Sequence, residues 1–316
     1  MPQISVIVLT YNPDNRKLRQ TLTAIARQKE VDFEILISDD GSARKDFSFL
    51  PEFMENLGIN NYRLLAHKEN RGTVGSCHGA VKEATGAYIF LTSPGDYLYD
   101  AYVLRDFYRF AETNHVALCF GNAVFYNTGN DAAVLTRSVG TPSHPCFYAP
   151  EASAALAKLR FFGGDWVIGA SYFRERTLFL RMLEQIRAES KYTEDTPTTA
   201  FAIAAGHRLY YFDRNVVWYE DGTGVSTGVS EKWKKLLHDD ALRCFTKLKS
   251  LYPKDPYVDI SFRNLSVPSR FRRILGKLIR HPVLMLRLTL SKKAAAKPIL
   301  CSCEDLEDLA QLLKIM

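Results

Sequence analysis

The sequence predicts an α/β fold in which a doubly wound, mostly parallel sheet is followed by a helical C-terminal tail. Short apolar runs, each long enough for one buried strand, alternate with segments of helical periodicity along the first part of the chain. Polar residues directly follow three of these runs, and basic residues accumulate after residue 268. Strand–helix alternation at such short intervals is typical of parallel sheets with crossover helices.

The composition is that of a globular protein. The 316 residues are 47% hydrophobic and 24% charged, enough for one large α/β domain with appendages or for two smaller domains. Six scattered cysteines do not form a disulfide framework and indicate a reducing cytoplasm. We expect no signal peptide, because the apolar run 4–9 is too short and lacks a basic lead. We also expect no membrane-spanning helix, because no apolar run reaches about 18 residues.

The first hundred residues contain four predicted buried strands. They cover residues 4–9, 33–37, 62–66 and 88–92. Leu18, Leu22 and Ile25 recur at helical spacing and predict a helix that ends near Gln28. A second helix is predicted over 73–84, which completes the alternation.

The later part of the chain is less regular. A further strand is predicted at 116–125, and two short strands at 209–212 and 216–219 predict a hairpin that turns at 213–215. Helices are predicted over 99–112, 198–205 and 304–316. The last of these is a short amphipathic helix that we expect to serve packing or oligomerisation.

Three of the predicted strands are followed by polar residues. These are Thr10, Tyr11 and Asn12 after the first strand, Asp39 and Asp40 after the second, and Asp96 after the fourth. Ligands of open α/β sheets bind beyond the carboxyl ends of the strands, so we expect these residues to converge on one site. The sequence has no G-x-G-x-x-G motif and no P-loop lysine motif. A nucleotide site would therefore be built from carboxylates and a metal ion.

Asp96 is the residue around which we expect the site to be organised. Ser93, Pro94 and Gly95 end the strand sharply and place Asp96 directly beyond its carboxyl end. A lone carboxylate there suits a hard cation that carries a phosphorylated ligand. The alternative on the local sequence is that Asp96 caps the next predicted helix, because Pro-Gly-Asp is common turn chemistry.

Five segments in a fixed order resemble the family-2 glycosyltransferases of the GT-A fold. They are ISVIVLTYN (4–12), EILISDDGS (34–42), Asn70-x-Gly72, GAYIFLTSPGDYL (86–98) and TED (193–195), within about the first 225 residues. The resemblance implies an inverting, metal-dependent enzyme that transfers a sugar from a nucleotide diphosphate donor, expected to be a UDP-sugar. It also implies a GT-A domain over 1–225, with the donor site in about 1–115 and the acceptor and base region in about 116–225. Residues 226–316 would form a helical C-terminal region.

The resemblance assigns the donor nucleotide to the first two strand ends. Asp40 corresponds to the carboxylate that contacts the base and ribose, and Asp39 is its neighbour. Tyr11 corresponds to a residue that lines the nucleoside pocket, with Thr10 and Asn12 beside it.

The metal ion, Mn²⁺ or Mg²⁺, is assigned to the third strand end. Asp96 corresponds to the metal-binding aspartate of the family's DXD motif, and Gly95 is placed in the donor site beside it. The chain departs from the family because Ser93 and Pro94 stand where further carboxylates are usual. The resemblance therefore implies a metal site that depends on the diphosphate of the donor.

The catalytic base is expected in the pair Glu194 and Asp195. In the resembling family the second acid of this pair takes the proton of the acceptor hydroxyl, and Glu194 would support or orient Asp195. The alternative is a helix cap, because an acid at the start of the predicted helix 198–205 is favoured by the helix dipole.

Two further residues are assigned to the acceptor side. Asp165 and Trp166 lie in a glycine-rich, aromatic stretch, and a carboxylate beside an aromatic face suits a sugar. In the resembling family this region lies beside the acceptor, which is expected to be a glycan or a polyprenyl-linked glycan. The alternative is a packed turn with Trp166 in the core.

The tail over 268–293 predicts a basic amphipathic helix. Apolar residues recur at helical spacing, and the segment 270–293 contains no acidic residue. Its basic residues are Arg270, Arg272, Arg273, Lys277, Arg280, Arg287, Lys292 and Lys293. The pattern indicates attachment to an anionic membrane surface, so that the protein would be cytoplasmic and peripheral on the inner face of the cell membrane. A helix packed on the domain with a solvated basic face is the alternative, and no motif supports nucleic acid as a partner.

A second function also fits the sequence. A catalytically silent protein that binds sugar nucleotides or docks on membranes would keep the same fold, and fold alone does not settle function. The reduced DXD motif favours this alternative, as does the stretch 219–228, which has no basic residue to cover a diphosphate. The set Asp40, Asp96 and Asp195 favours the enzyme.

Overall fold

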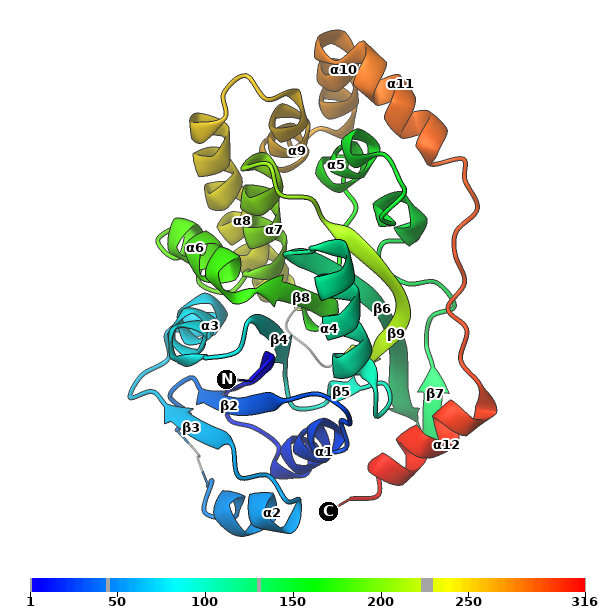
Figure 1. The fold of residues 1–316 in the computed structure, drawn as a ribbon. Helices are drawn as coiled ribbons and strands as arrows, with labels where there is room; N and C mark the ends of the chain where they lie inside the picture. Colours follow the sequence, from blue (N-terminus) through cyan, green and yellow to red (C-terminus); the bar gives the residue numbers. More distant parts are fainter. Residues whose placement is uncertain (1, 44–45, 130–131, 223–229, 316) are drawn as a thin grey trace.

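The computed structural model describes residues 2–43, 46–129, 132–222 and 230–315 (Figure 1). Most of the glycine-rich stretch 219–228 therefore lies outside the described residues. The strands form one mixed sheet in the order β3-β2-β1-β4-β8-β6-β9-β5, and β7 pairs with β6 at its side. The predicted α/β class, with a helical C-terminal tail, is confirmed (Figure 1).

The first half of the sheet is parallel, as predicted. Its strands are β1 (Ile4–Thr10), β2 (Phe33–Asp39), β3 (Tyr62–Ala66) and β4 (Tyr88–Thr92). The helices between them are α1 (Asn15–Ala26), α2 (Leu50–Asn56) and α3 (Gly72–Glu83). The apolar runs were sufficient to locate these strands, because β1, β2 and β4 are buried on both faces and leave little room for polar residues.

Alternating residues of the parallel strands point into two separate hydrophobic cores. Val6 and Val8 of β1 belong to the same core as Leu22 of α1. Ile7 between them belongs to the core of Val74 in α3. Helices therefore cover both faces of the sheet, which is the doubly wound arrangement that the sequence predicts.

The second half of the sheet contains strands of both directions. They are β5 (Tyr97–Leu98), β6 (Leu118–Gly129), β7 (Ala132–Leu135), β8 (Tyr172–Glu175) and β9 (Tyr210–Glu220). β8 is antiparallel to both β4 and β6, whereas β9 is parallel to β6. The predicted strand at 116–125 is confirmed as part of β6.

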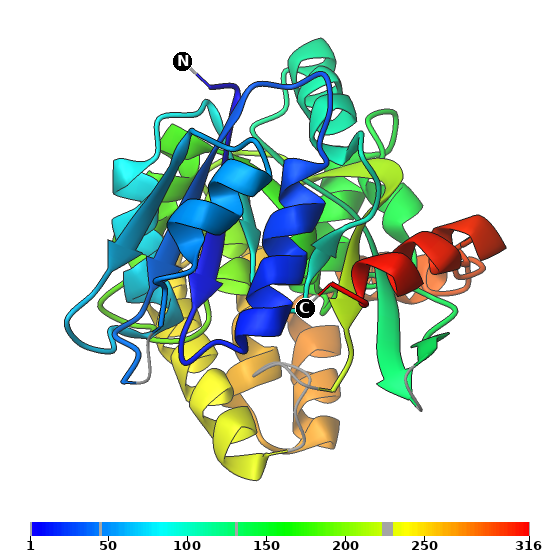
Figure 2. The ribbon, with the colours of Figure 1, turned by 90° about the horizontal axis from the view of Figure 1, so that it is seen from below.

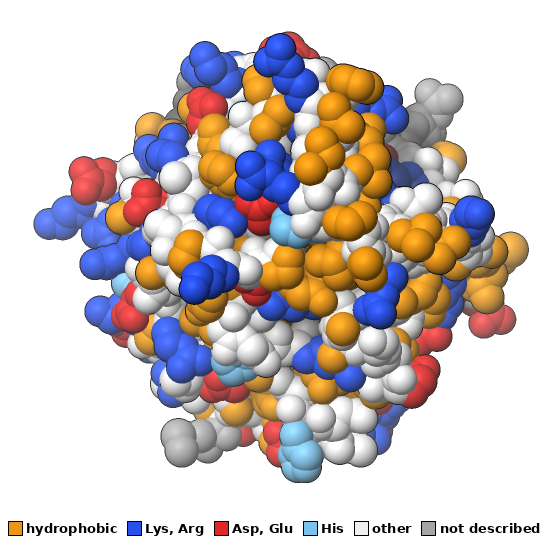
Figure 3. Space-filling view, turned by 90° about the horizontal axis from the view of Figure 1, so that it is seen from above, with side chains coloured by type: hydrophobic (Ala, Val, Ile, Leu, Met, Phe, Trp, Pro, Cys, Tyr) orange, Lys and Arg blue, Asp and Glu red, His pale blue; other side chains and the backbone are white. Residues whose placement is uncertain are grey.

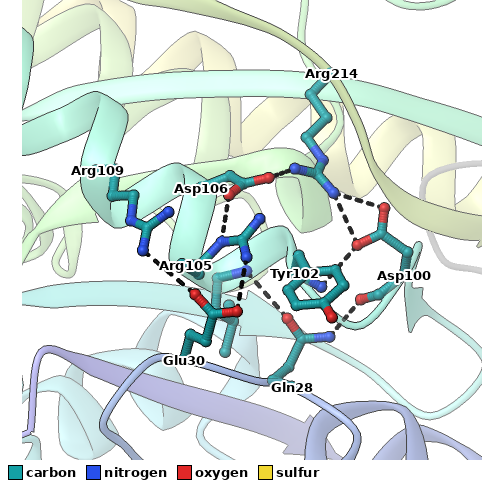
Figure 4. Close-up of polar contacts among 9 residues, drawn as sticks. Gln28, Glu30, Asp100, Tyr102, Arg105, Asp106, Arg109 and Arg214 are labelled. Atoms are coloured by element: carbon teal, nitrogen blue, oxygen red, sulfur yellow. Dashed lines mark hydrogen bonds and ion pairs between the residues drawn. The ribbon is translucent and has the colours of Figure 1, made fainter.

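The predicted hairpin around 213–215 is wrong, because β9 runs through these residues without a turn. β9 pairs with β6 along its length, and a register irregularity near Asn122 absorbs the extra residues. Arg214 Nη2 contacts the carboxylate oxygens of Asp100 at 2.6 and 2.8 Å. The Arg214 guanidinium also pairs with Asp106, and these residues belong to a polar network at the start of α4 (Figure 4). The polar triplet that suggested a turn thus anchors the strand to a helix.

Helices and 3-10 turns of the middle region surround the second half of the sheet. They are α4 (Val103–Asn114), η1 (Pro145–Tyr148), α5 (Ala154–Phe162), η2 (Gly169–Ser171), α6 (Arg176–Ile186), α7 (Asp195–Ala204) and α8 (Glu231–Leu251). α4 begins four residues later than predicted, with Tyr102 at its N-cap position, so Asp96 does not cap it. The capping interpretation of Asp96 is therefore wrong.

Helices form the C-terminal region, and the last of them returns to the N-terminal half of the molecule (Figure 1). They are α9 (Pro256–Ser266), α10 (Arg270–Arg280), α11 (Pro282–Ser291) and α12 (Cys303–Leu312). Arg16 and Gln20 of α1 donate hydrogen bonds to the carbonyl of Leu313 at 2.6 and 2.9 Å, and α12 lies beside α1 (Figure 2). The last helix thus serves packing, one of its two predicted roles. Among the described helices, none is both long and apolar enough to cross a membrane.

Candidate active site

The strand ends that the sequence singles out lie at one edge of the sheet. Thr10 at the end of β1 pairs with Asp39 at the end of β2, and Val8 pairs with Thr92 at the end of β4. A cavity of about 390 Å³ opens beyond the end of β4. Its polar lining includes Lys17, Asp96, Glu194, Asp195 and Glu220. These residues come from both halves of the chain.

A tight turn at the end of β4 presents Asp96 to this cavity. The Asp96 N–H donates to the Ser93 carbonyl at 3.0 Å, and Thr21 Oγ1 of α1 donates to the Asp96 carbonyl at 3.2 Å. Gly95 has φ +105°, and a Cβ there would lie 2.8 Å from Glu220 Oε2. The turn therefore requires glycine at this position, for its conformation and for the close approach of β9.

Glu220 and Lys17 adjoin Asp96. Glu220 ends β9, and its carboxylate accepts hydrogen bonds from Lys17 Nζ at 2.6 and 2.8 Å. Burial raises the pKa of Asp96 to about 8; the charge of Glu220 adds to the shift, and the Glu220 N–H and Lys17 oppose it. Two carboxylates and one lysine thus form the end of the cavity at β4 and β9, where negative charge is incompletely compensated.

Glu194 and Asp195 form another group of carboxylates in the cavity. Glu194 is the N-cap residue of α7, and Asp195 is its first helical residue. A Cβ at Gly169 would lie 3.1 Å from Glu194 Oε1 and 3.6 Å from Asp195 Oδ2, so both carboxylates border η2. Asp195 Oδ1 accepts a hydrogen bond from the Thr196 N–H at 2.6 Å. The helix therefore begins three residues before its predicted start at Thr198, and its first turn is also a wall of the cavity.

The segment before this pair is fixed by a buried acid of α8. Asp240 Oδ2 accepts hydrogen bonds from the N–H groups of Lys191 and Tyr192 at 2.9 and 2.7 Å, and from Ser190 Oγ at 3.1 Å. Asp240 is 3% exposed. These bonds hold the backbone that leads into Glu194, which makes the position of the carboxylates independent of any ligand.

Burial shifts the titration of both carboxyl groups upward. Burial and the charge of Asp195 raise the pKa of Glu194 to about 7, against the charge of Arg174. Burial also raises the pKa of Asp195, opposed by the Thr196 N–H and by Arg174. Such a pair is basic enough to take a proton near neutral pH.

Arg174 of β8 supplies the compensating positive charge. Its guanidinium carbon lies 4.2 Å from the ring centroid of Tyr172 and 4.4 Å from that of Phe179. The side chain is 2% exposed, and its nitrogens have no hydrogen-bond partner within the described part of the chain. The buried charge therefore acts on Glu194 and Asp195 through space, where the low dielectric strengthens its effect.

The sequence profile named Glycosyl transferase family 2 matches residues 5–177, more than half of the chain. The chain belongs to glycosyltransferase family 2. Curated relatives include the PGL/p-HBAD biosynthesis glycosyltransferases of Mycobacterium tuberculosis and Mycobacterium bovis, 30% identical over 129 residues. These residues are 40% of this chain and 49% of the relative, so the chain spans about half the length of the curated relatives it matches.

Solved structures confirm the GT-A fold of this family-2 chain. TarS of S. aureus, residues 1–349 in complex with UDP-GlcNAc, aligns with a TM-score of 0.63 at 17% identity, covering 87% of this chain and 73% of TarS. A mannosyltransferase of Pyrobaculum calidifontis in complex with GDP-Man and Mn²⁺ aligns with a TM-score of 0.55 at 14% identity. That alignment covers 98% of this chain and 79% of the mannosyltransferase. At such identities the likeness concerns the fold alone.

Asp96, the residue that the sequence assigns to a metal ion, lies beside a second carboxylate, that of Glu220. Within the described ranges, no group of three metal-ligating side chains is present. Asp96 and Glu220 nevertheless place two carboxylates at one end of the cavity. Hard divalent cations prefer carboxylate oxygens and take their remaining ligands from substrate phosphates and water. The charge of Glu220 beside Asp96 gives this end of the cavity two carboxylates for one lysine, so these residues fit a divalent ion.

The residues assigned to the donor nucleotide lie at the predicted edge but outside the cavity lining. Asp40 accepts hydrogen bonds from the N–H groups of Arg71 and Gly72 at 2.8 and 2.9 Å. Asp39 bonds to Ser42. Tyr11 is 53% exposed. In this family-2 chain the two acids shape the loops of the edge, and Tyr11 remains accessible to a nucleotide.

Neither residue of the predicted acceptor side lines the cavity. Arg160 donates two hydrogen bonds to Asp165, at 2.9 and 3.0 Å, and Tyr148 donates a third at 3.0 Å. These contacts give Asp165 a structural role. Trp166 is 42% exposed, so it is not a core residue as the packed-turn alternative required.

Sequence reasoning missed Lys17 and Glu220. Glu220 carries the same signal that identified Asp96, a carboxylate at the end of an apolar strand, but the expected hairpin obscured it. Lys17 had no local signal, because its partner Glu220 is 203 residues away in the sequence. Only the position of β9 beside β5 brings the two together.

Proposed function

We propose that the protein is an inverting glycosyltransferase that moves a sugar from a nucleotide diphosphate donor, a UDP-sugar, to a hydroxyl of a glycan or lipid-linked glycan. The observation that carries the proposal is the single cavity lined by Asp96, Glu194 and Asp195. In the proposal, the charged diphosphate binds near Asp96, and the base is supplied by the pair Glu194 and Asp195. The mycobacterial relatives are named as glycosyltransferases of PGL/p-HBAD biosynthesis, which supports sugar transfer as the reaction.

In the proposed reaction, Asp195 accepts the proton of the acceptor hydroxyl. The hydroxyl oxygen attacks the anomeric carbon, and the bond to the diphosphate breaks on the opposite face, which inverts the configuration. A base positioned in this way contributes on the order of 10²–10⁴ to the rate. Like charges on the two acids raise the pKa of Glu194, so the pair holds a proton more readily than an isolated carboxylate would.

The other end of the cavity would receive the leaving diphosphate. Asp96 and Glu220 would hold Mn²⁺ or Mg²⁺ there, and the bound ion would act as a Lewis acid on the phosphate oxygens. Lys17 adds a positive charge at the same place through its contact with Glu220. This arrangement supplies the basic residue that the stretch 219–228 lacks.

The proposal is tested by screening sugar nucleotides with and without Mn²⁺. A ligand that binds the native state raises the melting temperature, so we expect one nucleotide class to stabilise the protein in a metal-dependent way. The same donor should release its nucleoside diphosphate slowly in water and faster with the acceptor. Stabilisation without any release would support the catalytically silent alternative, and no stabilisation by any sugar nucleotide would contradict both.

The acid limb of the pH–rate profile is expected to lie near neutral pH. Asp195 must be ionised to accept a proton, so the rate falls as pH drops through the raised titration range of the pair, in which Glu194 has a pKa of about 7. Glu194→Gln removes one of the two like charges of the pair, and with it the group that has a pKa of about 7, so the acid limb should move to lower pH. Glu184→Gln, an exposed change on α6, is the control with an unchanged limb. If the acid limb of Glu194→Gln stays at the pH of the wild type, Glu194 does not influence the titration that limits the rate.

A further inference from the structure

Helix α10 is packed with its polar face against the protein. Lys277 is its buried residue, and its Nζ donates a hydrogen bond to Asn264 Oδ1 of α9 at 2.6 Å. Arg273 Nη1 donates to the Asn264 carbonyl at 2.8 Å. Two basic side chains, Arg273 and Lys277, therefore lie on the inner face of this helix, which is the reverse of the usual arrangement of a surface helix.

The apolar face of α10 is exposed instead. Phe271 is 73% exposed and Ile279 is 71% exposed, and Ile274, Leu275 and Leu278 are exposed as well. The alternative expectation, a helix that packs its apolar side on the domain and exposes its basic side, is therefore wrong. Monomeric soluble proteins rarely expose a contiguous apolar surface of this kind unless it binds something.

A network around Asp259 of α9 fixes this orientation. Asp259 pairs with Lys249 of α8 at 2.9 Å, with Arg263 at 3.0 Å and with His281 at 2.9 Å. His281 lies between α10 and α11. His281 thus joins the C-terminal end of α10 to α9, and the bonds of Arg273 and Lys277 to Asn264 keep the apolar face pointing outward.

The exposed apolar surface continues onto α11. Val283, Leu286 and Leu290 are 62%, 61% and 53% exposed. Hydrophobic side chains gather on this face of the molecule, with Lys and Arg among them (Figure 3). We call the surface formed by α10 and α11 the apolar–basic face. All eight charged residues of 270–293, with histidine set aside, are basic.

We propose that the apolar–basic face docks on an anionic lipid bilayer. Apolar side chains along two successive helices would enter the boundary between headgroups and acyl chains, while arginines and lysines contact anionic headgroups. A second copy of this chain fits less well, because two basic faces would repel each other. The inference goes beyond the proposed function, since it concerns a surface separate from the cavity.

The experiment is co-sedimentation of the full chain with vesicles of phosphatidylcholine, with and without phosphatidylglycerol. We expect binding to the anionic vesicles at low salt, little binding to the neutral ones, and release at high salt because surface charges are then screened. Arg272→Gln with Arg280→Gln should weaken binding roughly 10- to 30-fold. Arg27→Gln with Lys82→Gln removes the same charge from α1 and α3 and should have a much smaller effect.

The apolar contribution is tested separately. Phe271→Ser with Ile279→Ser should weaken vesicle binding roughly 10-fold or more at an unchanged melting temperature, since both side chains are exposed. Leu64→Ser with Leu251→Ser is the matched control on other exposed leucines.

The proposal is overturned if the full chain does not bind anionic vesicles at low salt, or if the control variants weaken binding as much. A dimer that the Phe271 and Ile279 variant abolishes, without vesicle binding, would assign the face to a second copy. No donor or acceptor is needed, so the outcome is independent of the proposed reaction.

Discussion

Asp195→Asn is expected to lower the transfer rate by roughly 10² or more while donor affinity stays close to that of the wild type. Asparagine has the size of aspartate and retains an oxygen that can accept the Thr196 N–H, so the start of α7 is preserved. It cannot accept the proton of the acceptor hydroxyl. The loss should therefore appear in kcat and not in the binding of the donor, which is measured by calorimetry with the sugar nucleotide alone.

A matched control separates this effect from a general loss of charge. Asp308→Asn makes the same chemical change on the exposed side of α12 and should leave the rate unchanged. If Asp195→Asn retains a rate within a few-fold of the wild type, the base must lie elsewhere. Glu194 is then the remaining candidate in the cavity, because Asp165 is held by Arg160 and Tyr148 outside it.

The sequence was sufficient to predict the parallel half of the sheet and the edge at which the site lies. Fully buried strands must be almost entirely apolar, so their ends are visible where polar residues begin. Parallel strands then bring those ends together without further information. The sequence alone therefore predicts Asp39 and Asp96 on one edge, and the strand pairing confirms it.

Features that depend on contacts between distant segments were not predictable in the same way. The triplet 213–215 has the composition of a turn, yet Asp213 accepts a hydrogen bond from Tyr211, and Asn215 Nδ2 donates one to the Leu300 carbonyl. The residues between Tyr211 and Asn215 are accommodated as an irregularity in the pairing of β9 with β6, so the strand continues where the local sequence favours a turn. The same holds for α10, where periodicity identifies an amphipathic helix but does not say which face packs on Asn264.

Asp96→Ala and Asp96→Asn are expected to abolish the increase in donor affinity that Mn²⁺ gives to the wild type. Each removes one of the two carboxylates at the end of the cavity and leaves Glu220 paired with Lys17. The fold should survive, because the turn is held by backbone bonds to Ser93 and Thr21 that do not involve the side chain. Asp32→Asn, an exposed change before β2, is the control that should keep the full metal effect.

Stability gives this prediction a second measurement. Burial raises the folded pKa of Asp96 to about 8, so the ionised carboxyl costs stability, and this cost grows as pH rises from the ordinary value of an aspartate to about 8. Asp96→Asn removes that cost and keeps an oxygen for the Glu220 N–H, so without ligand it should melt at or above the wild-type temperature near pH 8. The expected combination is an unchanged or more stable protein whose donor binding no longer responds to Mn²⁺. An unaltered Mn²⁺ response in both variants would show that Asp96 does not hold the metal. A lower melting temperature of Asp96→Asn than of the wild type would show that the charge of Asp96 is compensated in the folded protein.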